Sequence, residues 1–175
     1  MRYEGEEFTV KSTFRNGVEG IINRLHGYGT CPPNSVYNFA VYEDSTVVAA
    51  FTWNVPVYGV TKLFNDKCLC LTRMVALPRE ERKLRHISKP LRYTIKHMID
   101  RVKYPVLVTY SDDSMNHNGY TYECAGFKFD GRGSGRMIVT ADGRRKASVS
   151  SGKRVELELG ERYVTFDTKR WVHRL

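Results

Sequence analysis

Apolar residues recur at helical spacing in two stretches of the chain. In Asn16–His26, apolar residues stand at 18, 21, 22 and 25, which predicts an amphipathic helix. A second helix is predicted to open at Ser88, because Ser is a good N-cap and Pro90 is tolerated in a first turn. Its apolar face consists of Leu91, Ile95, Met98 and Ile99.

Runs of β-branched and aromatic residues predict strands. Val36–Tyr42 and Thr46–Trp53, separated by a short polar turn, predict an antiparallel hairpin. Lys67–Leu77 is mostly apolar, as expected of a central strand buried on both faces. Shorter strands are predicted at Glu6–Lys11, Val106–Tyr110, Phe127–Asp130, Arg136–Thr140, Val155–Leu159 and Tyr163–Phe166.

The order of these elements predicts one α+β domain over residues 1–175, with a mixed, mostly antiparallel sheet and helices on both faces. Lys67 to Tyr110 forms a β-α-β unit, which should cross over right-handed. Asn118–Cys124 predicts a short helix, and Ala141–Lys153, rich in Gly, Ser and basic residues, predicts a loop. We expect a core over about residues 6–130 and a basic, β-rich extension over 131–175.

Composition excludes several classes of protein. Hydrophobic residues at 41% and charged residues at 27% are ordinary globular values, and no apolar run reaches the roughly 18–20 residues of a membrane span. The four scattered cysteines predict reduced thiols, and the first residues contain no apolar signal core. We therefore expect a cytoplasmic protein that has no membrane partner.

The net charge of +9 is concentrated in two blocks. Residues 79–103 carry nine Lys or Arg against three Asp or Glu, and residues 131–175 carry eleven against five. Basic side chains gain affinity for a polyanion by releasing its condensed counterions. The charge favours duplex DNA as a partner, with a solvated basic surface as the alternative.

The most specific short string is Tyr122-Glu123-Cys124-Ala125-Gly126-Phe127. A tyrosine four residues before Gly-Phe, on a short helix after a strand, resembles the tyrosine of the GNAT superfamily of acetyltransferases. There the matching tyrosine protonates the departing coenzyme A thiolate, which is general acid catalysis. The alternative is a core tyrosine packed against the sheet.

Residues from His26 to about Gly131 are similar to the phage Mom-type DNA-modification proteins, a divergent branch of that superfamily. The likeness rests on Asn38-Phe39-Ala40-Val41-Tyr42, on Leu71-Thr72-Arg73-Met74-Val75, and above all on Thr109-Tyr110-Ser111-Asp112-Asp113 followed by Gly119 to Phe127. Such proteins place a carbamoylmethyl-type group on the exocyclic amine of adenine in DNA, which blocks host restriction enzymes. The resemblance implies that activity here, in the cytoplasm of a phage-infected bacterium.

The resemblance also implies the site residues. Tyr122 is the expected proton donor, and Arg73 and Asp112 orient the centre, with Asp112 as the candidate partner of the Arg73 guanidinium, as a base, or as a metal ligand. His26 matches a histidine near the substrate, and Ser88 matches the serine that opens the cofactor-side helix. The implied donor is acetyl-coenzyme A or a related acyl donor.

One stretch departs from the superfamily pattern. Its phosphate loop carries two glycines, whereas the aligned residues Lys83-Leu84-Arg85-His86-Ile87-Ser88 contain none. A helix N-terminus with Lys83, Arg85, His86 and Lys89 around it still suits a phosphate. These basic side chains favour another phosphate-bearing donor, or contact with DNA.

Further residues suit DNA and metal contacts. An enzyme acting on an adenine amine must extrude the base and hold it between flat apolar groups, for which the candidates are Trp53, Tyr58, Phe64 and Trp171. The expected phosphate contacts are Arg132, Arg136, Arg144, Arg145, Lys146, Lys153 and Arg154. Cys68 and Cys70 read as core residues, and no structural metal is expected. A cluster of His26, Asp112 and His117 is an alternative site for iron.

Three hypotheses follow. The first is a Mom-like enzyme that modifies adenine in duplex DNA. The second is an ordinary GNAT acetyltransferase acting on a protein or small-molecule amine. The third is a non-enzymatic DNA-binding, anti-restriction protein. A homodimer remains open in each case.

Overall fold

The computed structural model describes residues 8–26, 30–56, 58–64, 67–102, 104–113, 117–143, 145–148 and 156–174; for Tyr58 and residues 145–148 it describes the backbone alone. The helices are α1 Asn16–Leu25, α2 Tyr58–Leu63, η1 Arg79–Glu81, α3 Ser88–His97, the π-helix η2 Met98–Val102 and α4 Tyr120–Cys124. The strands are β1 Thr9–Thr13, β2 Tyr37–Glu43, β3 Thr46–Asn54, β4 Cys68–Ala76, β5 Val106–Asp112, β6 Lys128–Val139, β7 Arg145–Ser148 and β8 Arg162–Arg174.

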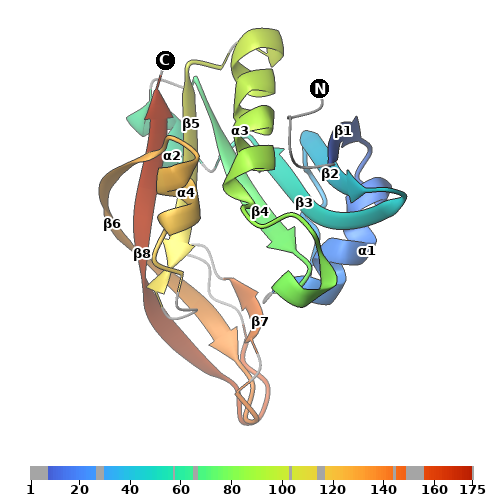
Figure 1. The fold of residues 1–175 in the computed structure, drawn as a ribbon. Helices are drawn as coiled ribbons and strands as arrows, with labels where there is room; N and C mark the ends of the chain where they lie inside the picture. The colour runs from blue at the N-terminus through green and yellow to red at the C-terminus, as the bar shows by residue number, and fades with distance from the viewer. Residues whose placement is uncertain are drawn as a thin grey trace.

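The strands form one eight-stranded sheet in the order β1-β2-β3-β4-β5-β8-β6-β7 (Figure 1). β4 and β5 are parallel, and each of the other neighbouring pairs is antiparallel. The predicted hairpin is confirmed as β2 and β3, and the predicted β-α-β unit as β4, α3 and β5. The predicted α+β class with a mixed sheet is confirmed.

Helices cover both faces of the sheet. Val18 and Ile22 of α1 pack on Ala40, Ala50 and Val75 on one face. On the other face, α3 contributes Leu91 and Ile95, and η2 contributes Met98, to a cluster with strand residues such as Phe39, Phe51 and Leu107. The apolar stripes predicted for both helices are confirmed, because each helix packs this side against the sheet. Side chains alternate along a strand, so each strand can pack against helices on both faces.

The carboxyl-terminal third of the chain is part of the main sheet. Strand β8 lies between β5 and β6, so the segment expected as an extension over residues 131–175 supplies an interior strand. The strands predicted at Phe127–Asp130 and Arg136–Thr140 are one continuous strand, β6. Its glycines obscured it, because Gly is depleted in strands and usually marks turns.

Three other expectations on local structure are wrong. Residues 156–158 are not a strand, and the loop expected over Ala141–Lys153 contains strand β7. Ser88 is the first residue of α3 and makes no capping hydrogen bond, because Ile87 holds the cap position. Within the described ranges, no helix is long and apolar enough to cross a membrane.

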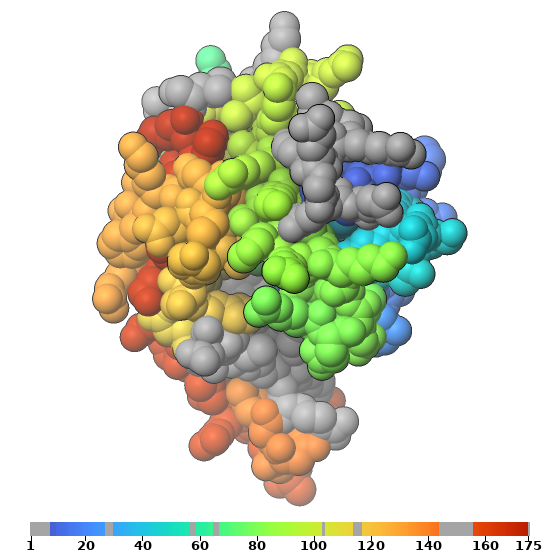
Figure 2. Space-filling view, in the orientation of Figure 1, coloured from blue at the N-terminus to red at the C-terminus, as the bar shows by residue number. Residues whose placement is uncertain are grey.

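β6 and β8 continue beyond the end of β5. Asp112, the last residue of β5, pairs with Thr168, while β8 still pairs with β6 from Asp167 to Arg162. We call residues 134–139 and 162–167, with β7 beside them, the arm. Figure 2 shows the arm, in orange and red, reaching beyond the body of the molecule.

Candidate active site at the split between β4 and β5

The parallel strands β4 and β5 separate halfway along their length. Their pairing runs from Cys68–Val106 to Leu71–Thr109, whereas β4 continues to Ala76 and β5 to Asp112. A cavity of about 720 Å³ lies at this split. It is lined by Leu25 and His26, by residues 70–76 and 110–112, by residues 117–122, and by Phe166 and Thr168 of β8. Its volume falls within the range of small-molecule sites, roughly 300–1,000 Å³.

Tyr122 stands where the two strands part. Its side chain is 9% exposed and lines the cavity. The hydroxyl hydrogen-bonds to the side chain of Thr109, which donates in turn to the carbonyl of Leu71 at 3.3 Å. Burial raises the pKa of Tyr122 above its usual value of 10. The phenol therefore stays protonated at neutral pH, as a proton donor must.

Trp171 of β8 holds the helix that carries Tyr122. Its indole nitrogen donates to the Ser111 hydroxyl at 3.0 Å, and its ring lies 6.5 Å from that of Tyr122. A Cβ at Gly119 would come within 2.0 Å of the Trp171 ring, and Gly119 has a φ of +85°. Only glycine allows both the backbone conformation and the contact. The turn before Tyr122 is thus fixed against the sheet.

A β-bulge turns Arg73 toward α1. β4 pairs with β3 through Leu71–Trp53 and Arg73–Thr52, so Thr72 is the extra residue. Leu71 belongs to the cluster under α3, whereas Val75, two residues beyond Arg73, packs with α1. Because side chains alternate along a strand, the bulge moves Arg73 to the α1 face. Its guanidinium donates to the carbonyls of Thr72 at 2.8 Å and Thr30 at 3.1 Å.

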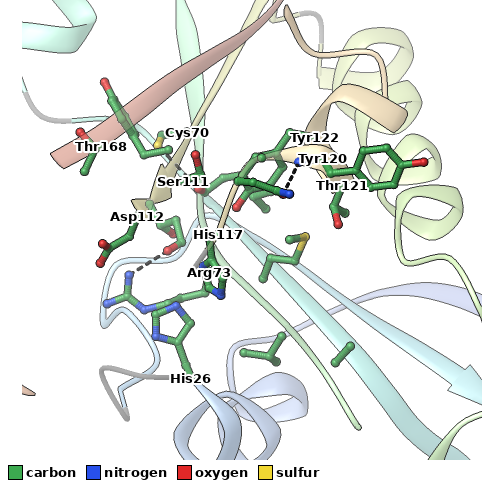
Figure 3. Close-up of a pocket in the computed structure, with 18 of the residues that line it drawn as sticks. His26, Cys70, Arg73, Ser111, Asp112, His117, Tyr120, Thr121, Tyr122 and Thr168 are labelled. Atoms are coloured by element: carbon green, nitrogen blue, oxygen red, sulfur yellow. Dashed lines mark hydrogen bonds between the residues drawn. The ribbon is translucent and has the colours of Figure 1, made fainter. Parts of the chain in front are cut away.

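Asp112, His26 and His117 line the same cavity as Arg73 (Figure 3). Asp112 lies on β5 two residues after Tyr110, and its carbonyl accepts from the backbone of His117 at 3.2 Å. The pKa of His26 is lowered from 6.5 to about 4, mainly by burial and also by repulsion from Arg73 and His117. His26 is therefore a neutral imidazole at pH 7, able to accept a proton.

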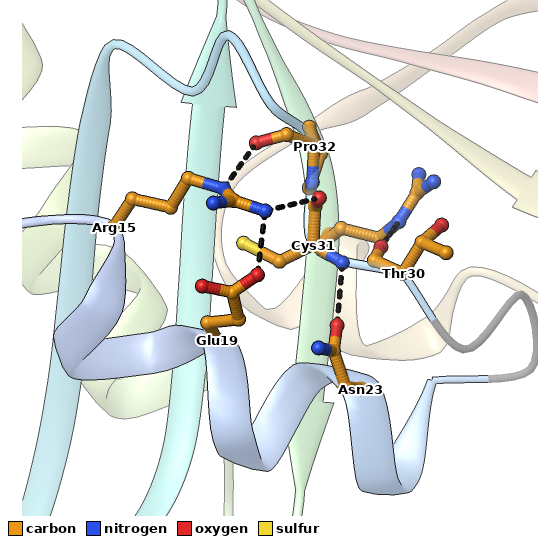
Figure 4. A network of polar contacts seen from close by, with 7 residues as sticks. Arg15, Glu19, Asn23, Thr30, Cys31 and Pro32 are labelled. Atoms are coloured by element: carbon orange, nitrogen blue, oxygen red, sulfur yellow. Dashed lines mark hydrogen bonds and ion pairs between the residues drawn. The ribbon is translucent and has the colours of Figure 1, made fainter.

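A polar network secures the loop beside Arg73 (Figure 4). The Arg15 guanidinium donates to Glu19 at 2.6 Å, to the Pro32 carbonyl at 3.2 Å and to the Cys31 carbonyl at 3.4 Å. The Cys31 amide donates to the Asn23 side chain at 2.8 Å. These bonds tie residues 31 and 32 to α1. They also fix Thr30, whose carbonyl receives the Arg73 guanidinium.

The structure therefore brings four predicted site residues together: Arg73, Asp112, Tyr122 and His26 all line one cavity. Sequence reasoning did not identify two further residues of the site, Thr109 and Phe166. Thr109 lies in the predicted strand, but its contact with Tyr122 depends on how α4 packs. Phe166 was expected only as part of a strand, and its place in the cavity depends on the position of β8 in the sheet.

Three of the four predicted base-stacking residues are buried outside the cavity. Trp53 is fully buried, Phe64 and Trp171 are 7% and 8% exposed, and none of the three lines the cavity. Phe64 lies in the turn that follows α2, and the Arg174 guanidinium stacks on its ring at 5.2 Å. Tyr58 is the first residue of α2. Core packing therefore buries Trp53, Phe64 and Trp171, and the role of Tyr58 stays a prediction.

The predicted iron cluster is not supported. Among the residues that the structure describes, no three His, Cys, Asp or Glu side chains are grouped as a metal site requires. His26, Asp112 and His117 share the cavity, but the cationic Arg73 lies among them and repels charge on His26. Cys68 and Cys70 are buried, as expected, and burial raises the pKa of Cys70 to about 12.

Four of the predicted phosphate contacts lie on or near the arm. Arg132 is exposed on β6, and Arg136 is half-buried with its guanidinium 4.6 Å from the centre of the Tyr163 ring. Arg145 and Lys146 belong to β7. Arg144, Lys153 and Arg154 lie outside the described residues.

Comparison with known proteins decides the family. A family model described as "Mom protein family" matches residues 7–172. The chain belongs to the Mom protein family. None of the curated proteins matches it. Among solved structures, it is similar in fold to acetyltransferases, so this Mom protein has a GNAT-like fold.

Three of these structures illustrate the likeness. A chimera of Vibrio cholerae spermidine N-acetyltransferase has a TM-score of 0.60 and 11% identity, over 97% of this chain and 96% of that one. A Bacillus cereus IAA acetyltransferase gives 0.57 and 11%, over 96% and 99%. A GNAT family acetyltransferase from Elizabethkingia anophelis, with acetyl-CoA bound, gives 0.53 and 12%, over 97% and 99%. Family and fold together support an acyl-transfer type of function.

The β4–α3 loop of this Mom protein differs from a pyrophosphate cradle. Glu43 of the β2–β3 hairpin accepts hydrogen bonds from the backbone amides of Lys83, at 2.8 Å, and Leu84. Glu43 is 7% exposed, and Asp44 beside it pairs with the Lys83 ammonium at 3.3 Å. A carboxylate thus already occupies two amides of the loop, and like charge would repel a phosphate there.

The residues predicted for the cofactor lie on this loop and, for Ser88, at the start of α3, apart from the cavity. Lys83, Arg85 and His86 are exposed, Ser88 is buried, and none of the four lines the cavity. The split itself, with Tyr122 at its fork, fits the reactive end of an acyl donor. The loop, which has no glycine and carries the bound Glu43 carboxylate, does not fit the pyrophosphate of coenzyme A.

Proposed function

We propose that this protein transfers a small acyl-derived group, of the carbamoylmethyl type, to the N6 amine of adenine in duplex DNA. The observation that carries the proposal is the position of Tyr122 at the fork of β4 and β5, in the wall of a cavity that Arg73 and Asp112 also line. Membership of the Mom family supports DNA as the substrate. The net charge of +9 supports a polyanionic partner.

Each cavity residue has a role in this reaction. The adenine N6 forms a bond to the transferable carbon of the donor, while the bond from that carbon to the leaving group breaks. Tyr122 gives its proton to the leaving group. The raised pKa of Tyr122 keeps this proton on the phenol until the leaving group departs. Neutral His26, or the Asp112 carboxylate, takes the proton that the amine loses. The Tyr122 phenolate regains its proton from solvent.

Arg73 orients the centre from the α1 face. Its guanidinium is anchored through two backbone carbonyls, so its charge is held at the cavity wall. A fixed cation there stabilises negative charge that develops on the donor oxygen. Because base modification requires the target nucleotide outside the duplex, we propose that the cavity receives an extruded adenine. Arg132, Arg136, Arg145 and Lys146 are the proposed phosphate contacts.

The test is mass spectrometry of nucleosides from the DNA of bacteria that express the chain. We expect a heavier adenine nucleoside with the wild-type protein and a loss of about 10²–10⁴-fold with Tyr122→Phe. Tyr93→Phe, on α3 outside the cavity, is the matched control and should retain modification. Full modification by Tyr122→Phe would refute the role of the phenol.

The same experiment separates the other two functions. If the wild type leaves every adenine unmodified, the proposal fails. Acetylation of a protein or small amine would then indicate an ordinary acetyltransferase. Salt-dependent DNA binding without any change in nucleoside mass would indicate a non-enzymatic DNA-binding protein. In a plot of the logarithm of the binding constant against the logarithm of the salt concentration, each phosphate contact contributes a slope of about −0.9.

A further inference from the structure

Phe166 forms an aromatic part of the cavity wall at the base of the arm. It lies on β8 two residues before Thr168, the partner of the last residue of β5. Both Phe166 and Thr168 line the cavity, and the Phe166 side chain is half-buried. The ring therefore stands where the cavity meets the arm that carries basic residues.

A glycine on the neighbouring strand determines how the ring lies. Phe166 pairs with Gly135 across the β6–β8 ladder. A Cβ at Gly135 would lie 2.2 Å from the Cζ atom of Phe166 and 2.7 Å from each Cε atom. The equal distances to the two Cε atoms place that Cβ above the plane of the ring, at its Cζ end. The Cζ end of one ring face therefore packs on the backbone of Gly135.

The other aromatic side chains of the cavity are engaged elsewhere. Tyr122 is buried with its hydroxyl on Thr109, and Tyr110 is half-buried with its hydroxyl bonded to Arg170. Tyr120 is 64% exposed, and Figure 3 shows its ring directed away from Arg73 and Asp112. Phe166 has no polar atom to satisfy, and its second face does not rest on Gly135.

We propose that this second face of Phe166 stacks on the extruded adenine and holds it for transfer. The inference rests on the proposed function and adds the residue that positions the base. Stacking requires a flat apolar surface, which the ring offers, and Gly135 supports the ring at its Cζ end. DNA phosphates bound along the arm would bring a base to this end of the cavity. A planar group of the donor is the competing occupant of the same surface.

The experiment measures stacking directly, with a duplex oligonucleotide that contains a single bulged 2-aminopurine. Stacking on an aromatic ring quenches this fluorescent adenine analogue. We expect the wild type to quench it, Phe166→Leu to lose at least three-quarters of the quenching, and Phe166→Trp to retain it. Phe129→Leu is the matched control, because Phe129 is 53% exposed on β6 and lies outside the cavity.

A second variant tests the support for the ring. Gly135→Ala should displace the ring and reduce quenching and adenine modification together, whereas Gly20→Ala, where the new Cβ meets no atom within 4 Å, should change neither. Quenching by Phe166→Leu equal to the wild type would overturn the proposal, as would equal loss by Phe166→Leu and Phe166→Trp. Quenching by the wild type without any modified adenine in cells would refute the proposed function but leave the stacking surface established.

Discussion

The Tyr122 hydroxyl bonds to Thr109 at the residue where β5 separates from β4. Thr109 is fully buried and passes the hydrogen bond on to the Leu71 carbonyl, so the phenol is connected to both strands at the fork. This contact lowers the pKa of Tyr122, while burial, the larger effect, raises it. The phenol proton that we assign to catalysis is therefore hydrogen-bonded to a single neutral hydroxyl, that of Thr109.

Thr109→Val should raise the pKa of Tyr122 further, because it removes the hydroxyl that can turn from the Leu71 carbonyl to donate to the phenolate. The loss of a buried hydrogen bond should cost about 1 kcal/mol of stability. Ultraviolet titration of the phenol, as the difference between this variant and the same variant with Tyr122→Phe, measures the pKa. Thr94→Val is the control, since Thr94 is equally buried but bonds within α3. An unchanged pKa would contradict the proposed contact.

Gly119→Ala should lower the stability by about 1–3 kcal/mol, because the new Cβ would overlap the Trp171 ring at a positive φ. We expect thermal unfolding to show a lower Tm and, since Tyr122 follows this turn, modification to fall as well. Gly20→Ala lies in the open middle of α1 and should be neutral or stabilising. Equal Tm values for the two variants would argue against the contact.

His26 should make stability depend on pH. Its pKa is about 4 in the folded protein and 6.5 when unperturbed, so the unfolded chain binds more protons between these values. The contribution of neutral His26 is therefore complete above pH 6.5 and is lost as the pH falls toward 4. Urea unfolding at pH 7.5 and pH 5 should show a larger loss for the wild type than for His26→Gln. His97, whose pKa is also lowered by burial, is present in both proteins and cancels in the difference.

Glu43 should protect the amides of Lys83 and Leu84 from hydrogen exchange, because its carboxylate accepts from both. Glu43→Ala should therefore increase exchange at these two amides by at least tenfold, as measured by mass spectrometry of peptides that cover the loop. Asp44→Ala removes only the exposed pair with the Lys83 side chain and should leave exchange unchanged. Equally fast exchange in the wild type would show that the carboxylate does not bind the loop.

The sequence by itself determined most of the elements of the fold. The helical spacing of apolar residues in α1 and α3 and the β-branched runs of β2, β3, β4 and β5 are local patterns, and the structure confirms each of them. The Tyr122–Phe127 string and the strand end at Asp112 carried the family resemblance, which the match over residues 7–172 confirms. Local periodicity suffices to predict these elements, because burial of one face or both faces sets the spacing of apolar residues along the chain.

Only the tertiary structure decided which residues share the cavity. The Thr72 bulge sets the face on which Arg73 lies, and a bulge depends on the partner strand. Phe166 reaches the site because β8 inserts beside β5, a pairing between residues far apart in the chain. Three aromatic residues suited base stacking by their chemistry, yet the fold buries each of them: Trp53, Phe64 and Trp171. Long-range packing, which leaves no periodic signal in the sequence, decided which of these aromatic side chains lies in the cavity and which are buried in the core.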